Sequence, residues 1–271
     1  MAISTNSLVT LTTLKAFLGI TTTTDDAILE ATIDRSSDYI RRYCARNFVA
    51  ARYYEWKDTY GANRVTLRHN PVTNVRFVGV GGDNVVSVNS SISTDAAATI
   101  SVDDVHVHLF RVESNGQEHS TTINFSSQKT TNDLAAQISA TTGFTASALL
   151  NVKTNYLRKL AGRDLKQQTC LLEAPTEGLT DYTVDYHRGI IYGPTLSRYQ
   201  GILVDYTGGF DAVPYDIQQA TIEMATRLYR GRKRDPGLAS ESLGGYSYST
   251  RSVSEVDAST KMILDGYRRL R

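Results

Sequence analysis

The first third of the chain has the hydrophobic spacing of two helices. Thr10 precedes the segment LTTLKAFL, which stops at Gly19, and this predicts a short helix with a threonine N-cap and a glycine C-cap. Asp25 and Asp26 then begin a longer helix that runs to about Arg46. Its apolar positions are three or four residues apart and form one face notched by a serine: Leu29, Ile33, Ser36, Ile40 and Tyr43. We expect another helix to pack on this face.

Strand patterns dominate the middle of the chain. Short strands are expected in WKDTYGANRVTLRHNPVTNVRFV, with a turn at His69-Asn70-Pro71. Between Gly79 and Ala148, twenty of the residues are Ser or Thr. There TISVDDVHVHLFRV and HSTTINFSS are predicted as strands joined by a turn at Asn115-Gly116, and TTNDLAAQISATT as an amphipathic helix. This region has the pattern of a separate β-rich subdomain.

The last third returns to a strand and helix pattern. The segments DYTVDY, RGIIYGP and YQGILVDYTGGF predict a three-stranded meander. Pro214 then opens the helix DIQQATIEMATRLYR, and SEVDASTKMILDGYRRLR predicts a final helix. Four residues of the first of these two helices fall on one stripe: Ile217, Thr221, Met224 and Leu228.

The segment ESLGGYSYSTR, residues 241–251, lies between these two helices and has little to bury within itself. Its Gly-Gly pair permits unusual backbone torsions, and Tyr246 and Tyr248 lie on one side if the segment is extended. Two interpretations stay open. The segment is either a flexible linker to the last helix or an arm that becomes ordered on a partner.

Composition excludes several classes of protein. With 271 residues and 41% hydrophobic content, the chain is long enough for one large or two smaller domains with a real core. No apolar run approaches the roughly 18 residues of a membrane span, and the N-terminus lacks the pattern of a signal peptide. We therefore expect a soluble protein. Cys44 and Cys170 are far apart and predict neither a disulfide framework nor a zinc knuckle.

The net charge of +1 hides a basic C-terminal end. Residues 227–271 hold 10 Lys or Arg against 5 Asp or Glu, whereas residues 1–226 hold 19 against 23. The stretch RLYRGRKR, residues 227–234, carries five cations in eight positions. Such a cluster attracts phosphate or an acidic protein surface, but it is equally typical of a solvated helix end, where cations meet the carbonyl pole of the helix dipole.

Motifs for catalysis or cofactor binding are missing from the sequence. His106 and His108 alternate with valines and would face the same way in a strand, which is one element of a metal site. No motif supplies a third ligand, so we expect an ordinary surface pair and no metal. The stretch GVGGDN lacks the third glycine of a dinucleotide loop, and no nucleophile elbow, Walker loop or His-Glu-x-x-His is present. We expect no enzymatic activity and no cofactor.

The order of the segments resembles the head-to-tail connector, or adaptor, family of long-tailed double-stranded DNA phages. The resemblance lies in TLTTLKAFLGITTTTDDAILEATIDRSSDYIRRYCARNF and, further on, in HNPVTNV, VDYHRGIIYG, VDYTGGFDAVPYDIQQATIEMATRLY and ESLGGYSYS. It covers about residues 8–78 and 181–271. Residues 79–180 depart from short family members, so we interpret them as an insertion.

This resemblance implies an α+β fold with a helical core, built from long N-terminal and C-terminal helices, and a small antiparallel sheet. The adaptor core would be residues 1–78 and 181–240, with a β-rich subdomain inserted at 79–180 and a C-terminal arm and helix at 241–271. It also implies a structural virion protein, assembled in the host cytoplasm, that forms a dodecameric ring at the portal vertex and surrounds the DNA exit channel.

The implied partners are other copies of the chain, the portal protein, a stopper or tail-completion protein and, by proximity, packaged double-stranded DNA; no membrane is expected. The arm would be loose in the free subunit and ordered on the portal. The residues expected to contact the portal are Tyr246, Tyr248, Arg251, Tyr267, Arg268, Arg269 and Arg271. Basic residues expected to face the channel or a partner are Arg227, Arg230, Arg232, Lys233 and Arg234. The alternative is a stand-alone nucleic-acid-binding protein that uses the same 227–234 cluster.

Overall fold

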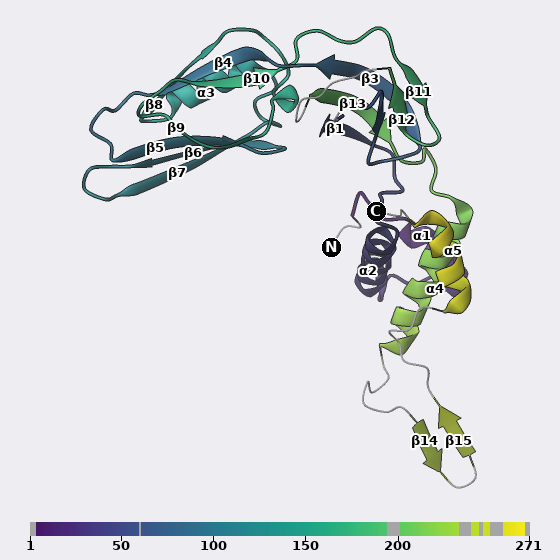
Figure 1. Cartoon of the computed structure of the whole chain (residues 1–271). Coiled ribbons are helices and arrows are strands. Elements are labelled where there is room, and N and C mark those ends of the chain that lie inside the picture. Colours follow the sequence, from purple (N-terminus) through teal and green to yellow (C-terminus); the bar gives the residue numbers. More distant parts are fainter. Residues whose placement is uncertain are drawn as a thin grey trace. The chain divides into compact units, whose positions relative to one another are not determined.

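The chain divides into two compact units. A computed structural model describes residues 4–59, 61–193, 201–232, 240–243, 246–249 and 257–268. The helical unit comprises Met1–Ala51, Arg68–Thr73 and Gly208–Arg271. The β unit comprises Arg52–Leu67 and Asn74–Thr207 (Figure 1).

Four helices pack together in the helical unit: α1 (Leu11–Leu18), α2 (Asp26–Cys44), α4 (Tyr215–Gly231) and α5 (Ala258–Tyr267) (Figure 1). Thr10 caps α1 by accepting a hydrogen bond from the backbone N–H of Thr13 at 3.2 Å, and Gly19 ends it with a φ of 70°. Both sequence predictions are confirmed. Ser36 of α2 is fully buried, and α2 packs against α4, as expected of a notched face.

Two apolar clusters hold the four helices together. The first combines Ile40 of α2 and Ile217 of α4 with Leu264 of α5, and all three side chains are fully buried. The second combines residues of α1, α2 and α4: Leu14, Leu29, Ile33, Ile222 and Ala225. The last helix is therefore part of the core of this unit.

The tyrosine-containing segment before α5 forms strands in the structure. β14 (Ser240–Leu243) and β15 (Tyr246–Ser249) pair in antiparallel fashion, with Leu243 opposite Tyr246 and Glu241 opposite Tyr248. The segment is thus a hairpin that doubles back on itself.

The β unit contains two sheets that share one apolar core with a helix. One sheet has the order β7-β6-β5-β9 and the other the order β10-β4-β8. Val86 of β4, Ile100 of β5, Leu109 of β6 and Leu134 of helix α3 (Thr131–Ala140) all lie in that core. The strands are β4 (Asp83–Ser90), β5 (Ala97–Val102), β6 (His106–Val112), β7 (Glu118–Asn124), β8 (Phe144–Ala148), β9 (Leu160–Asp164) and β10 (Cys170–Ala174).

Two further small sheets and a short 3-10 helix, Thr154–Tyr156, are also described. Their orders are β1-β13-β3 and β11-β12-β2. The strands are β1 (Ala51–Lys57), β2 (Arg64–Thr66), β3 (Val72–Val80), β11 (Thr183–Asp185), β12 (Ile190–Tyr192) and β13 (Ile202–Gly208).

The predicted helical core with long terminal helices is wrong as a description of the whole chain. The described residues form fifteen strands in five sheets against five α-helices, and the C-terminal helix has only 10 residues. The fold is still α+β, but strands predominate. The long helices α2 and α4 have a strong helical period, whereas most of the strands are too short to show a comparable pattern.

Two strand predictions also differ from the structure. The predicted meander does not form, because β11 and β12 pair with each other but β13 lies between β1 and β3. TISVDDVHVHLFRV is two strands, β5 and β6, separated by a turn at Asp103–Val105. Pairing with a strand distant in sequence overrides local order in the first case, and a tight turn interrupts the pattern in the second.

Residues on both sides of the expected insertion contact it inside the β unit. The indole N–H of Trp56 donates to the carbonyl of Leu157 at 3.0 Å, and the Tyr156 hydroxyl donates to Asp205 at 2.9 Å. The β unit is therefore wider than residues 79–180. The insertion itself stays a prediction.

Candidate interaction surfaces and a histidine cluster

Aromatic and arginine side chains attach α5 to its own unit. The ring of Tyr267 lies edge-on to Phe48, with 5.6 Å between the centroids, and its hydroxyl donates to Asp216 at 3.0 Å. The Arg46 guanidinium lies 5.6 Å from the ring centroids of both Phe48 and Phe210. Burial, followed by the hydrogen bond to Asp216, raises the pKa of Tyr267. Tyr267 thus has a role inside the subunit, and its contact with a portal stays a prediction.

Arg268, the next predicted contact residue, lies beside an aromatic pair on α2. Its guanidinium is 5.6 Å from the ring centroid of Tyr43, which stacks on Tyr39 with 6.1 Å between the centroids. Tyr43 also donates a hydrogen bond to Asp265 of α5. Because Tyr39 is 39% exposed, this cation and aromatic group offers a mixed surface of the kind found at protein interfaces.

The basic cluster predicted at 227–234 has one member with a clear internal role. Arg232 bonds Asp25 at 3.0 Å, donates to the carbonyl of Tyr229 at 2.8 Å and lies 3.7 Å from the centre of the Tyr229 ring. The Tyr229 hydroxyl also donates to Asp25. Arg232 therefore joins the end of α4 to the start of α2. Arg230 is exposed, whereas Arg227 is partly buried.

The side chains of the other predicted site residues lie outside the described part of the structure. Lys233, Arg234, Arg251, Arg269 and Arg271 lie outside the described residues. For Tyr246 and Tyr248 only the backbone pairing of β15 is defined. Their roles therefore stay predictions.

A set of large apolar side chains, not predicted from the sequence, is exposed on the helical unit. Their exposed fractions are large: 51% for Phe17, 42% for Ile28, 39% for Tyr39, 89% for Tyr215 and 75% for Met262. They come from all four helices and lie off the stripes that face the core. In the sequence, these residues could have been recognised as apolar positions that fall outside the core-facing stripe of each helix.

The histidine pair of the β unit has a third companion that the sequence analysis also missed. A carboxylate oxygen of Asp103, in the turn before β6, lies 3.3 Å from His106 Nδ1 and 2.9 Å from His108 Nε2. Among the described residues this is the group with the donor atoms to hold a metal ion. The sequence does place an aspartate three residues before His106. Its proximity to the histidines was not predicted, because the turn that contains it has the composition of a strand.

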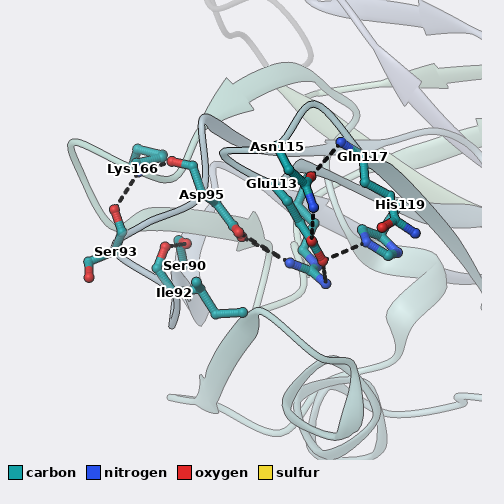
Figure 2. Close-up of polar contacts among 10 residues, drawn as sticks. Ser90, Ile92, Ser93, Asp95, Glu113, Asn115, Gln117, His119 and Lys166 are labelled. Atoms are coloured by element: carbon teal, nitrogen blue, oxygen red, sulfur yellow. Dashed lines mark hydrogen bonds and ion pairs between the residues drawn. The ribbon is translucent and has the colours of Figure 1, made fainter.

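A second charged network in the β unit is fully matched internally. The Arg111 guanidinium is buried and bonds Asp95 at 3.2 Å and Glu113 at 3.0 Å, and His119 Nε2 lies 2.8 Å from the same oxygen of Glu113. Figure 2 shows Asp95, Glu113, Asn115 and His119 converging on this point. Because each charge has an opposite partner, the network holds two loops together and leaves no free group for a ligand.

No curated protein matches the chain. Among solved structures, the neck of an empty GTA particle aligns with a TM-score of 0.39 and 12% identity over 100% of this chain and 94% of that one. The virion of a native gene transfer agent particle aligns with a TM-score of 0.38 and 14% identity over the same shares. Scores this low carry no argument about fold or function.

A family model matches the first half of the chain in part. Residues 8–138 match the phage gp6-like head-tail connector proteins, a stretch that includes α1, α2 and the strands from β1 to β7. Within the described residues, no helix has the length and apolar character needed to cross a membrane. Through residues 8–138, just under half of its length, the chain is similar to the phage gp6-like head-tail connector family.

Proposed function

We propose that this protein forms a ring at the portal vertex of the virion, joins the portal to a stopper or tail-completion protein and surrounds the channel through which DNA leaves. The observation that carries this proposal is the match of residues 8–138 to the head-tail connector family. The ring is dodecameric in the proposal, as the family resemblance implies.

The exposed apolar residues of the helical unit support contact between copies. A closed ring has heterologous contacts, so each subunit needs two different lateral patches. Phe17 on α1 and Tyr215 at the start of α4 are exposed by 51% and 89%, and they belong to different helices from Met262 on α5. Burying such side chains stabilises an assembly by about 1.5–3 kcal/mol for each fully buried residue.

The hairpin β14–β15 and the adjoining residues are proposed to contact the portal. Its two tyrosines belong to the residue type that often dominates interface energy. The residues after α5, Arg269 and Arg271, would add a contribution that weakens with salt. In this proposal α5 acts as the fixed base of the arm, because Leu264 is fully buried in the helical unit.

The alternative, a stand-alone nucleic-acid-binding protein, has less support. Arg232 is engaged with Asp25 and Tyr229 inside the helical unit, so the cluster offers fewer free cations than its sequence suggests. A ring also needs little affinity for DNA from each subunit, since every basic residue near a channel is repeated by symmetry.

Electron microscopy of particles tests the function directly. A phage lacking the gene is grown with or without the wild-type protein supplied in trans. We expect a ring beneath the portal with the wild-type chain, and DNA-filled or leaking heads without tails when the protein is absent. A neck that assembles normally without the protein contradicts the proposal. Binding of the isolated chain to DNA fragments at physiological salt favours the alternative.

A further inference from the structure

We propose that Asp103, His106 and His108 form a binding site for a divalent transition-metal ion of the zinc class on the outer face of the sheet β7-β6-β5-β9. The proposal departs from our expectation that the chain binds no metal. It is independent of the proposed neck function, because it rests on the β unit alone.

The strand β6 places the two imidazoles on one face. His106 and His108 alternate with Val107 and Leu109, which are buried in the apolar core. Burial of these two residues fixes the face of the strand, so the histidines must point away from the core. Their ring centroids lie 5.5 Å apart.

The turn between β5 and β6 supplies the carboxylate already oriented. One oxygen of Asp103 accepts the backbone N–H groups of Val105 and His106, both at 2.7 Å. The other oxygen faces His106 Nδ1 at 3.3 Å and His108 Nε2 at 2.9 Å. The turn therefore holds this second oxygen between the two imidazoles.

Distances and exposure are compatible with a metal ion. One donor atom from each of the three residues lies within 4.8 Å of the others. In a tetrahedral zinc site the bonds are about 2.0–2.2 Å long, so two donors are about 3.3 Å apart. Side-chain exposures of 29% for His106, 40% for His108 and 47% for Asp103 leave room for the small rotations needed. They also leave the fourth position open to water.

The neighbour of His108 fits the hydrogen bond that a metal-bound histidine makes, whereas the neighbour of His106 must rearrange. His108 Nδ1 lies 3.1 Å from the Thr122 hydroxyl, which can accept its proton while Nε2 binds the ion. The amide nitrogen of Asn124 lies 3.4 Å from His106 Nε2, because the amide oxygen accepts the N–H of Ser126 at 2.8 Å. An ion at His106 Nδ1 would displace the proton that faces Asp103 and leave the imidazole proton on Nε2, so the Asn124 amide must turn to present its oxygen to that proton.

The donor set indicates the class of metal. Two imidazoles and one carboxylate suit zinc, cobalt or nickel far better than calcium or magnesium, which prefer oxygen ligands. A purely hydrogen-bonded His-Asp-His group is the competing explanation, and it predicts no stoichiometric affinity for any of these ions.

Titration of the full-length, tag-free protein with cobalt(II) distinguishes the two. We expect visible absorption that saturates at one ion per chain and is displaced by zinc. The variants His106→Gln, His108→Gln and Asp103→Asn should each weaken cobalt binding at least about tenfold. His119→Gln is the matched control, because His119 lies on β7 of the same sheet but contacts Glu113 instead.

Asp103→Asn also guards against a folding artefact, since the amide oxygen still accepts the N–H groups of the turn. Circular dichroism and the thermal midpoint of each variant are recorded alongside. The proposal is overturned if the wild-type chain shows no saturable binding, or if binding survives in the variants of Asp103 and both histidines. It is also overturned if His119→Gln lowers affinity as much as His108→Gln does.

Discussion

The hydroxyl of Tyr156 lies 2.9 Å from a carboxylate oxygen of Asp205, a side chain with no exposed surface. Arg52 completes the group, with its Nε 2.8 Å from the other oxygen of Asp205. Burial opposes the charge on Asp205, but the hydrogen bonds from Arg52 and Tyr156 outweigh it and lower its pKa. A buried anion is thus held by two strands and the short 3-10 helix.

Replacing Tyr156 by Phe should lower the free energy of unfolding by about 1.5–3 kcal/mol, the usual value of a hydrogen bond to a charged group. Asp205→Asn should lower the free energy of unfolding by about 3 kcal/mol. This is the low end of the range for breaking a buried ion pair, because the Arg52 side chain is 37% exposed and can be solvated. Urea denaturation measures both. Tyr192→Phe, which changes a side chain 37% exposed, should stay within about 0.5 kcal/mol of wild type. If all three variants lower the free energy of unfolding by the same amount, the buried Asp205 group does not stabilise the fold as proposed.

Acid should weaken the network of Figure 2 through Glu113. The hydrogen bond from His119 lowers the pKa of Glu113 below its ordinary value of 4.5; burial opposes this, and Arg111 reinforces it. Ionised Glu113 therefore stabilises the fold above about pH 4.5, and this contribution is lost as the pH falls through the lower folded pKa. The stability difference between wild type and Glu113→Gln should shrink from about pH 6 to about pH 3. A difference that is constant with pH would refute this, and the exposed Glu118→Gln serves as control.

The helix α5 should be protected from hydrogen exchange in the free subunit. Leu264 is fully buried and Thr260 is 1% exposed, so opening of α5 exposes core surface. Leu264→Ala should cost about 2–5 kcal/mol and speed exchange along α5. Met262→Ala, on the same helix but 75% exposed, should do neither. Mass spectrometry of exchanged peptides reports both, and rapid exchange in wild-type α5 would show that the helix is not docked.

Replacing Tyr246 and Tyr248 together by Ser should block attachment of the ring to the portal while leaving the subunit folded. Each aromatic anchor at an interface is often worth about 2 kcal/mol or more. The expected particles contain DNA but carry no tails, and electron microscopy with plaque counts measures the loss. The paired control replaces Tyr186 and Tyr192, two exposed tyrosines of the β unit. If the variant of Tyr246 and Tyr248 forms normal virions, the hairpin does not contact the portal through these tyrosines and is only a linker.

Local signals in the sequence predicted local structure well. The caps of α1, the apolar face of α2 and the helix α3 all depend on residues within a few positions of each other. Thr130 and Asp133, for example, form a reciprocal capping box at the start of α3. The turn at Asn115-Gly116 is confirmed by a φ of 87° at Gly116.

Features that depend on distant partners were not predictable in this way. β13 lies between β1 and β3, strands that are more than a hundred residues earlier in the chain, and no local pattern records that pairing. Asp103 was missed as a companion of His106 because valines on both sides gave the turn the composition of a strand. The internal role of Tyr267 required knowledge of the aromatic residues Phe48 and Phe210.

The division of the chain has a consequence for its synthesis. The helical unit is built from Met1–Ala51, Arg68–Thr73 and Gly208–Arg271, so α2 leaves the ribosome long before its partner α4 exists. The β unit, by contrast, is complete once Thr207 has emerged. Translation therefore favours folding of the β unit first, while α2 waits with its apolar face uncovered. The surface made from α1, α2, α4 and α5 becomes available only after Tyr267, the last residue of α5, has emerged, so contacts of the proposed ring that use this surface must follow synthesis of α5.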